Sequence, residues 1–228
     1  MIEFLFLDLD DTILDFKSEE RVAITETISS FGVTVTDAVL QHYHVINRSL
    51  WEQLERGEIT REEVLTQRFA KLFGELGVPV DPTLCARTYE KNLAIGHQFL
   101  PGAEEAVKRL SKKYRLFLAS NGTASVQAGR MTSADLYRYF ERVFVSQEIG
   151  HNKPSKAYFD ACFATIANFD PDRAMMVGDS LSSDIAGCIH AGIRTCWVNP
   201  RHQAHPEHIC PDYEIEALSQ LEALLETL

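Results

Sequence analysis

The sequence has few cysteines, and their arrangement does not suggest a covalent framework. The five cysteines of the 228-residue chain are scattered and odd in number, and none belongs to a C-x-x-C pair. This pattern argues against a disulfide scaffold and against a cysteine-ligated zinc site. It is typical of buried thiols in a reducing compartment, so we expect a cytoplasmic protein.

Long apolar runs and an excess of basic residues are also missing. No run approaches the length of a membrane span, and the first residues enter a strand-like run without a basic leader. The chain has 22 Lys and Arg against 33 Asp and Glu, a formal net charge of −11. We therefore expect neither a nucleic acid nor a membrane as partner, but a small molecule. The absence of a G-x-G-x-x-G motif argues against a dinucleotide cofactor. Oligomeric state is left open.

The apolar residues form strand-like runs that alternate with helical patterns. A hydrophobic content of 45% is ordinary for a globular protein with a sizeable core. The strand-like runs cover residues 2–7, 114–119, 142–145, 174–177 and 193–198. This alternation predicts an α/β fold, a Rossmann-like and mostly parallel sheet.

One long stretch breaks the alternation with helices alone. Residues 40–54 and 65–76 carry apolar side chains at helical spacing. Thr60 and Glu63 match a capping box, and Asp81 before Pro82 is typical of a helix start. We therefore predict a helical domain at residues 16–100, inserted into an α/β core formed by residues 1–15 and 101–228.

The motif D-L-D-D-T follows the first predicted strand. Asp8 and Asp10 should then lie at the carboxyl end of that strand, where open α/β sheets bind ligands. Like charges held this close need a cation or a shared proton. An Asp-rich surface turn is the alternative if the motif is considered alone.

Other polar residues with possible chemical roles follow later strands. Ser120 and Asn121 offer hydroxyl, amide and backbone N–H groups that suit phosphate oxygens, although S-N-G taken alone is a turn. Lys153 precedes a proline, which favours an extended backbone. Taken singly it is an ordinary exposed lysine.

A second acidic pair, Asp179 and Asp184, follows the fourth strand-like run. Capping of the next helix explains one aspartate but not two. Together with Asp8 and Asp10 they would place four carboxylates beside Lys153 at one edge of the sheet. Such a cluster requires a hard divalent cation, and Mg²⁺ prefers carboxylate oxygens and often binds with a substrate phosphate. The combination therefore predicts a metal-dependent phosphoryl-transfer site. Mn²⁺ accepts the same ligands.

These four motifs, in this order, resemble those of the haloacid dehalogenase superfamily, and the helical insertion resembles its cap domain. The resemblance implies that Asp8 is the nucleophile forming an aspartyl-phosphate and that Asp10 is the general acid and base. It implies that Ser120, Asn121 and Lys153 hold the phosphoryl group. The implied Mg²⁺ ligands are Asp8, the carbonyl of Asp10, Asp179 and, through water, Asp184. The second aspartate, Asp10, favours phosphatases over dehalogenases and P-type ATPases.

A narrower resemblance to bacterial pyrimidine 5′-nucleotidases covers nearly the whole chain. It rests on residues 47–51, 57–60, 68–69, 121–122, 139–140, 146–150 and 195–197, with Gln127, Arg130 and Leu136. It implies hydrolysis of pyrimidine nucleoside monophosphates. Two residues depart from the family pattern: Asp135 stands where glycine is expected, and Gln147 replaces glutamate. Neither change touches the four motifs.

Two aromatic residues are candidate substrate contacts. Trp51 would stack on a nucleobase or pack within the helical domain, and Phe16 would gate the site or cover the hinge. Three alternatives to the nucleotidase remain: a phosphatase of sugar phosphates or phosphoglycolate, a phosphomutase, and a non-catalytic binding protein. The last would be expected to lose motif residues, and none is lost.

Overall fold

The computed structural model describes residues 1–228, and the chain divides into two compact units. The first comprises Met1–Phe16 and His97–Leu228, and the second comprises Lys17–Gly96. The junctions lie within a few residues of those expected from the sequence. The role of the second unit as a cap stays a prediction.

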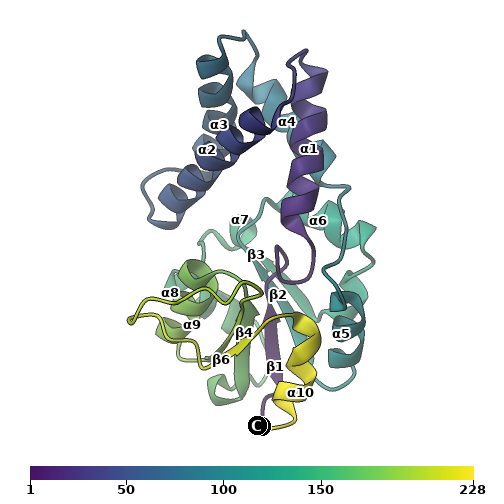
Figure 1. Ribbon diagram of the computed structural model, residues 1–228. Helices are drawn as coiled ribbons and strands as arrows, with labels where there is room; N and C mark the ends of the chain where they lie inside the picture. The colour runs from purple at the N-terminus through teal and green to yellow at the C-terminus, as the bar shows by residue number, and fades with distance from the viewer. The chain divides into compact units, whose positions relative to one another are not determined.

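The first unit is built on six parallel strands, as the predicted α/β fold class requires (Figure 1). The strands are β1 (Phe4–Leu7), β2 (Arg115–Ser120), β3 (Arg142–Val145), β4 (Ala174–Gly178), β5 (Arg194–Val198) and β6 (Tyr213–Ile215), in the order β3-β2-β1-β4-β5-β6. The five predicted strands are confirmed. The sixth was missed because it has three residues, of which only Ile215 is buried, too little for a periodic signal.

The alternation of side chains along β1 divides the core into two layers. Phe4 and Phe6 face one layer, which also contains residues of α8 (Lys156–Phe163) and α9 (Ala186–Ala191). Leu5 and Leu7 face the other, which contains residues of α5 (Ala103–Leu110), α6 (Ala124–Ser133) and α10 (Leu221–Leu225). Helices therefore cover both faces of the sheet (Figure 1), and the strand ends remain for the site.

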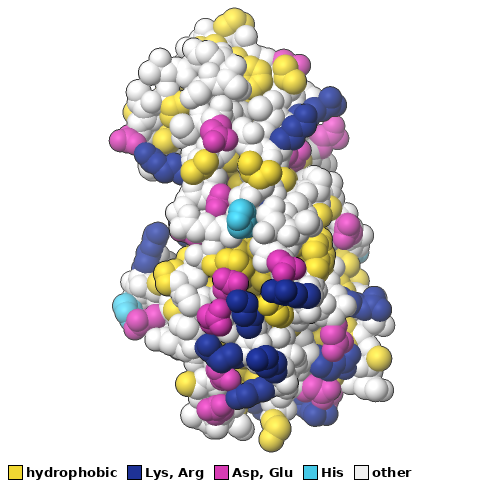
Figure 2. All heavy atoms as spheres, turned by 90° about the vertical axis from the view of Figure 1, so that its right-hand side faces the viewer, with side chains coloured by type: hydrophobic (Ala, Val, Ile, Leu, Met, Phe, Trp, Pro, Cys, Tyr) yellow, Lys and Arg dark blue, Asp and Glu magenta, His cyan; other side chains and the backbone are white.

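Shorter helical turns complete the connections of this unit. They are α7 (Ser146–Ile149), η1 (Tyr137–Tyr139), η2 (Pro171–Arg173), η3 (Leu181–Ile185) and η4 (Leu218–Gln220). Basic and acidic side chains are intermixed on the face that carries α5 (Figure 2). Arg109, for example, pairs with Glu222 at 2.7 Å.

The second unit contains only helices. The helices are α2 (Asp37–Glu55), α3 (Arg61–Leu76), α4 (Pro82–Leu93) and most of α1 (Phe16–Ser30). Both helix starts predicted from the sequence are confirmed: Thr60 and Glu63 form a capping box, and Asp81 caps α4 with Pro82 in its first turn. None of the helices in either unit combines the length and the apolarity needed to span a bilayer.

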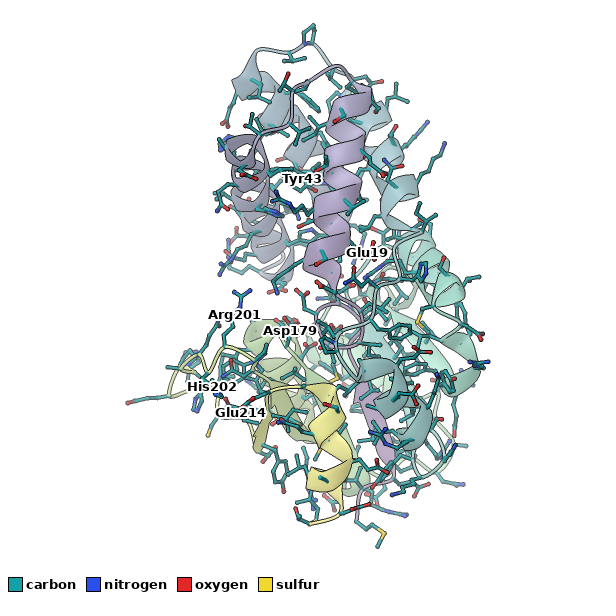
Figure 3. All side chains as sticks on the ribbon, turned by 45° about the vertical axis from the view of Figure 1, so that its right-hand side comes forward. Glu19, Tyr43, Asp179, Arg201, His202 and Glu214 are labelled. Carbon is teal, nitrogen blue, oxygen red and sulfur yellow. The ribbon has the colours of Figure 1, made fainter.

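A buried polar cluster joins the four helices of this unit. The Glu20 carboxylate accepts hydrogen bonds from Asn47 at 2.8 Å and Tyr89 at 3.3 Å, and it pairs with His44 at 3.0 Å. Arg68 donates to Asn47 and lies over the Tyr89 ring. Figure 3 shows the neighbouring Tyr43 among these helices. Two helices, α2 and α4, thus supply partners to one buried carboxylate on α1, and Arg68 of α3 supports one of those partners.

Candidate active site

Asp8 and Asp10 lie where β1 ends and the chain turns. The Asp8 N–H donates to the Val177 carbonyl at 3.0 Å, so the sheet ladder holds Asp8 in place. The backbone then folds into a turn in which the N–H groups of Ile13 and Leu14 both donate to the Leu9 carbonyl. Asp8 is buried, whereas the side chain of Asp10 is 27% exposed. The Asp8 carboxylate is therefore fixed in the interior, whereas the Asp10 carboxylate is accessible to solvent.

Lys153 is the positive centre of the site and is itself buried. Its ammonium donates to Asp8 Oδ1 at 2.8 Å, Asp184 Oδ1 at 2.6 Å and the Ala119 carbonyl at 2.7 Å. These three acceptors satisfy all three of its hydrogens. The sequence taken at this position alone predicts an ordinary exposed lysine; its burial and its ion pairs show that it is not one.

The carboxylates outnumber the ammonium. Burial raises the pKa of Asp8 well above its ordinary value; Lys153 opposes this rise, and Asp184, Asp10 and Asp179 add to it. Burial alone would lower the pKa of Lys153, but Asp184 and Asp8 raise it through charge and hydrogen bonds. The site therefore holds one ammonium among three carboxylates, those of Asp8, Asp179 and Asp184, an arrangement that a bound proton or cation relieves.

Asp179 and Asp184 are positioned by the turn after β4. Ser180, not Asp179, caps the helical turn, since its Oγ accepts from the Ser183 N–H. The turn η3 is a π-helix, and Asp184 within it is fully buried. Trp197 donates from its indole nitrogen to the Asp179 carbonyl at 2.9 Å. Asp179 lies at the carboxyl-end edge of the sheet (Figure 3).

Gly178 makes room for the Asp184 carboxylate. A Cβ built on this glycine would lie 2.1 Å from Asp184 Oδ2, far inside a van der Waals contact. The same oxygen accepts from the Ser180 N–H at 3.1 Å. A side chain at position 178 would therefore displace the carboxylate, which explains why the strand ends in glycine.

Asp8, Asp179 and Asp184 fit a divalent cation. Each offers one carboxylate oxygen, and these oxygens lie within 4.8 Å of one another. Oxygen ligands of octahedral Mg²⁺ at ~2.1 Å lie at most ~4.2 Å apart, so small side-chain rotations would close the cluster. The donor set, its burial and its excess negative charge all match a hard cation. Asp10 is not in this carboxylate cluster, and its contribution of a carbonyl ligand stays a prediction.

The loop after β2 faces the same edge of the sheet. Ser120 Oγ accepts from the Gly122 N–H at 3.0 Å. The Asn121 amide forms a two-way clamp with the backbone of Lys153: it donates to the carbonyl at 2.9 Å and accepts from the N–H at 2.8 Å. Asn121 thus holds the segment that carries the lysine. Its predicted contact with phosphate remains a prediction.

Two residues in contact with Asp10 come from α6, which follows this loop. Gln127 donates to Asp10 Oδ2 at 2.7 Å and to Ser120 Oγ at 2.8 Å, and Arg130 donates to Asp10 Oδ1. In the sequence, Gln127 and Arg130 stand out only through the resemblance to pyrimidine 5′-nucleotidases. Their i, i+3 spacing places them on one helix face, but only the fold shows that this face is buried against Asp10.

The two aromatic residues predicted to contact substrate lie in different parts of the structure. Phe16 is half-buried, and the Arg130 guanidinium carbon lies 5.5 Å from the centre of its ring. Trp51 lies on α2 of the helical unit, with Arg61 over its ring at 5.4 Å.

Asp135 has a positive φ of 52°, which explains why glycine is expected at this position. Gln147 Oε1 accepts from the Ala124 N–H at 2.8 Å and so caps α6, a role that glutamate would share.

Known proteins resemble this chain over nearly its full length. YfnB of Bacillus subtilis, named as a candidate HAD-hydrolase, is 36% identical, covering 97% of this chain and 94% of its own. Its magnesium-bound crystal structure superposes with a TM-score of 0.94 at 35% identity over 98% of both chains. Two proteins named pyrimidine 5′-nucleotidase are also similar.

The first of these is PynA of Streptococcus pneumoniae, 36% identical over 96% of this chain and 93% of its own. The second is YjjG of Escherichia coli, 31% identical over 98% and 97%. The family model described as haloacid dehalogenase-like hydrolase matches residues 5–198, from β1 through β5. This span includes every proposed site residue, and the chain therefore belongs to the haloacid dehalogenase-like hydrolase family.

Proposed function

We propose that this protein is a Mg²⁺-dependent phosphomonoesterase that acts through an aspartyl-phosphate on Asp8. The observation that carries the proposal is the carboxylate cluster of Asp8, Asp179 and Asp184, in which Asp8 and Asp184 are buried and both pair with Lys153. A cation bound there would lie beside both the proposed nucleophile and a fixed ammonium. That combination suits a phosphate dianion, which needs positive charge on its oxygens before a carboxylate can approach.

In the first step a carboxylate oxygen of Asp8 attacks phosphorus, and the bond from phosphorus to the ester oxygen breaks. Lys153, held by Asp8 and Asp184, offsets charge on the phosphoryl oxygens, and Ser120 binds one of them. When bound, Mg²⁺ supplies further charge neutralisation and orients the phosphate. Asp10 in its acid form donates a proton to the departing oxygen.

In the second step water hydrolyses the aspartyl-phosphate. Asp10, now a carboxylate, takes a proton from the water that attacks phosphorus, the bond from phosphorus to the Asp8 oxygen breaks, and inorganic phosphate leaves. These two steps explain why the carboxylates of Asp8 and Asp10 differ in burial and in hydrogen-bond partners. Asp8 is buried against Lys153, whereas Asp10 is partly exposed and can reach a leaving group.

The proposed substrates are pyrimidine nucleoside 5′-monophosphates. Support comes from PynA and YjjG, which are named pyrimidine 5′-nucleotidases and match this chain over more than nine-tenths of both lengths. The helical unit is proposed to act as a cap that excludes water and selects the leaving group. The crystal structure of YfnB with magnesium is described as revealing interdomain movement, which supports a mobile cap. Trp51 and Phe16 are the proposed contacts of the cap and hinge with substrate.

Phosphate release from a substrate panel tests the proposal. The panel contains pyrimidine and purine nucleoside monophosphates, sugar phosphates and phosphoglycolate, each with Mg²⁺, Mn²⁺ or EDTA. We expect metal-dependent release that is strongest with deoxyuridylate or thymidylate. Release only from sugar phosphates would keep the mechanism and reject the substrate. Isomerised product without free phosphate would identify a mutase instead.

The substitution Asp8→Asn tests the intermediate. It should reduce turnover by more than about 10⁴-fold, because an amide cannot form the acyl phosphate. Acid-quenched wild type should retain label from ³²P-substrate, and the variant should not. Asp160→Asn, on the exposed face of α8, is the matched control and should keep full activity. Substantial turnover by the Asp8 variant would refute this mechanism.

A further inference from the structure

Asp10 is held by hydrogen bonds to both carboxylate oxygens. Gln127 Nε2 donates to Oδ2 at 2.7 Å, and Arg130 Nη1 donates to Oδ1. Arg130 also donates to Gln127 Oε1 at 3.2 Å, which links the two donors. Both come from one turn of α6, although the chain separates them from Asp10 by more than 110 residues. A carboxylate bound at both oxygens by a single rigid element has a fixed plane.

Arg130 occupies an environment that does not favour a charge. It is fully buried, and its Nε and Nη2 atoms have no hydrogen-bond partner. Asp10 is the one carboxylate with which it pairs, and its guanidinium otherwise lies near the Phe16 ring. Burying a guanidinium with two unmatched donors destabilises a fold, and an apolar side chain of similar size would fill this space at less cost. Stability therefore does not explain arginine at this position.

We propose that Arg130 is a positioning residue that holds Asp10 in the orientation needed for proton transfer to the leaving group. This inference rests on the proposed phosphatase function and concerns the same site. Arg130 acts through Asp10 rather than by binding the phosphate. Its contact with Asp10 is direct, whereas the phosphate-side residue Ser120 is reached only through Gln127.

The physical reason lies in the geometry of proton donation. An acid must lie within hydrogen-bond reach of the oxygen it protonates, and an unrestrained aspartate samples several rotamers. Bonds from Gln127 and Arg130 select one of them. Gly122 permits this arrangement, since a Cβ there would lie 2.4 Å from Gln127 Nε2. The Asp10 side chain nevertheless remains 27% exposed, so a leaving group can reach it.

A leaving-group series separates positioning from a structural or phosphate-binding role. Arg130→Met would be compared with wild type on a nucleoside monophosphate, phenyl phosphate and p-nitrophenyl phosphate. We expect kcat on the nucleotide to fall about 10- to 100-fold, because its alkoxide requires a proton from Asp10. On p-nitrophenyl phosphate the loss should be below about threefold, because p-nitrophenolate leaves without one. KM should change little throughout.

A double-mutant cycle with Asp10→Asn makes the test specific. In that background Arg130→Met should cause no further leaving-group-dependent loss. Arg130→Lys should recover part of the activity on the nucleotide by restoring a donor. Arg130→Gln provides a second variant for the same series if the methionine variant does not fold. Arg138→Met, on the exposed turn η1, is the control and should behave as wild type.

Two results would overturn the inference. One is an equal loss on all three substrates, or a loss confined to KM, which would indicate a role in folding or in phosphate binding. The other is an additive loss in the Asp10→Asn background. Failure of the proposed function is distinguishable, because wild-type protein would then release phosphate from none of the substrates.

Discussion

At the scale of single residues, the site depends on how closely a few side chains approach one another. Lys153 contacts two carboxylates and one carbonyl, and Asp184 fits only because position 178 has no side chain. These contacts leave little room for adjustment. Small changes far from the nucleophile should therefore alter the chemistry through geometry.

Gly178→Ala should displace the Asp184 carboxylate, because the added Cβ would lie 2.1 Å from its Oδ2. We expect a loss of Mg²⁺ affinity and of turnover of about 10- to 100-fold, the usual effect of disturbing a ligand's support. Isothermal titration with Mg²⁺ and steady-state kinetics would measure both. Gly74→Ala is the matched control: nothing lies within 4 Å of a Cβ in this helix, so stability should rise by roughly 0.5–1 kcal/mol. Unchanged Mg²⁺ affinity in the position-178 variant would contradict the packing argument.

At the scale of elements, the helical unit relies on the polar cluster centred on Glu20. The hydrogen bond from His44 to Glu20 raises the pKa of His44, while burial and Arg21 act in the opposite direction. Arg68 and Tyr89 face the same carboxylate from α3 and α4. The stabilisation that the His44–Glu20 pair provides between α1 and α2 should therefore depend on pH in the neutral range.

The sign of this dependence follows from proton binding. Because the pKa of His44 is higher in the folded protein, the folded state binds the proton more tightly than the unfolded state does. The stabilisation of the fold by the His44–Glu20 pair is therefore complete below the ordinary pKa of histidine. It is lost as pH rises through the folded pKa. In wild type the free energy of unfolding should fall as pH rises above about 6.5, and in His44→Gln this fall should be smaller. The difference should be less than ~1 kcal/mol, because His44 is partly exposed. Urea titrations at several pH values measure this. An unchanged slope in the His44 variant would count against the pair.

At the scale of the whole molecule, the carboxylate cluster lowers the free energy of unfolding when no cation is bound. Burial and the neighbouring carboxylates raise the pKa of Asp8, so the folded state favours the protonated form. In metal-free protein this contribution to stability is therefore lost as pH rises from the ordinary pKa through the folded one. A cation that binds only the folded protein should reverse the loss.

Thermal unfolding with and without Mg²⁺ would show both effects. At about 100 times its Kd, Mg²⁺ should stabilise wild type by ~2.7 kcal/mol and raise Tm by several degrees. Asp8→Asn should melt above wild type in EDTA at neutral pH, since a buried charge is removed, and should gain much less from Mg²⁺. Asp160→Asn should follow wild type in both conditions. A full Mg²⁺ response in the Asp8 variant would place the cation elsewhere.

The sequence by itself determined the features that depend on local pattern. Buried runs such as residues 4–7 and 174–178 specify strands through continuous apolarity, and the polar residues after them specify one chemical edge. Asp8, Lys153 and Asp179 were therefore predicted as site residues without coordinates. The helical insertion and its caps at Thr60 and Asp81 were found in the same way, because a cap is a local hydrogen bond.

Tertiary structure alone decided which distant side chains meet. Gln127 and Arg130 reach Asp10 across more than 110 residues, and Trp197 reaches the Asp179 carbonyl from the neighbouring strand. It also decided that the Asp184 carboxylate lies over Gly178. Periodicity encodes which face of an element is buried, but not what that face is buried against. That choice depends on strand order and packing, which no local stretch of sequence contains.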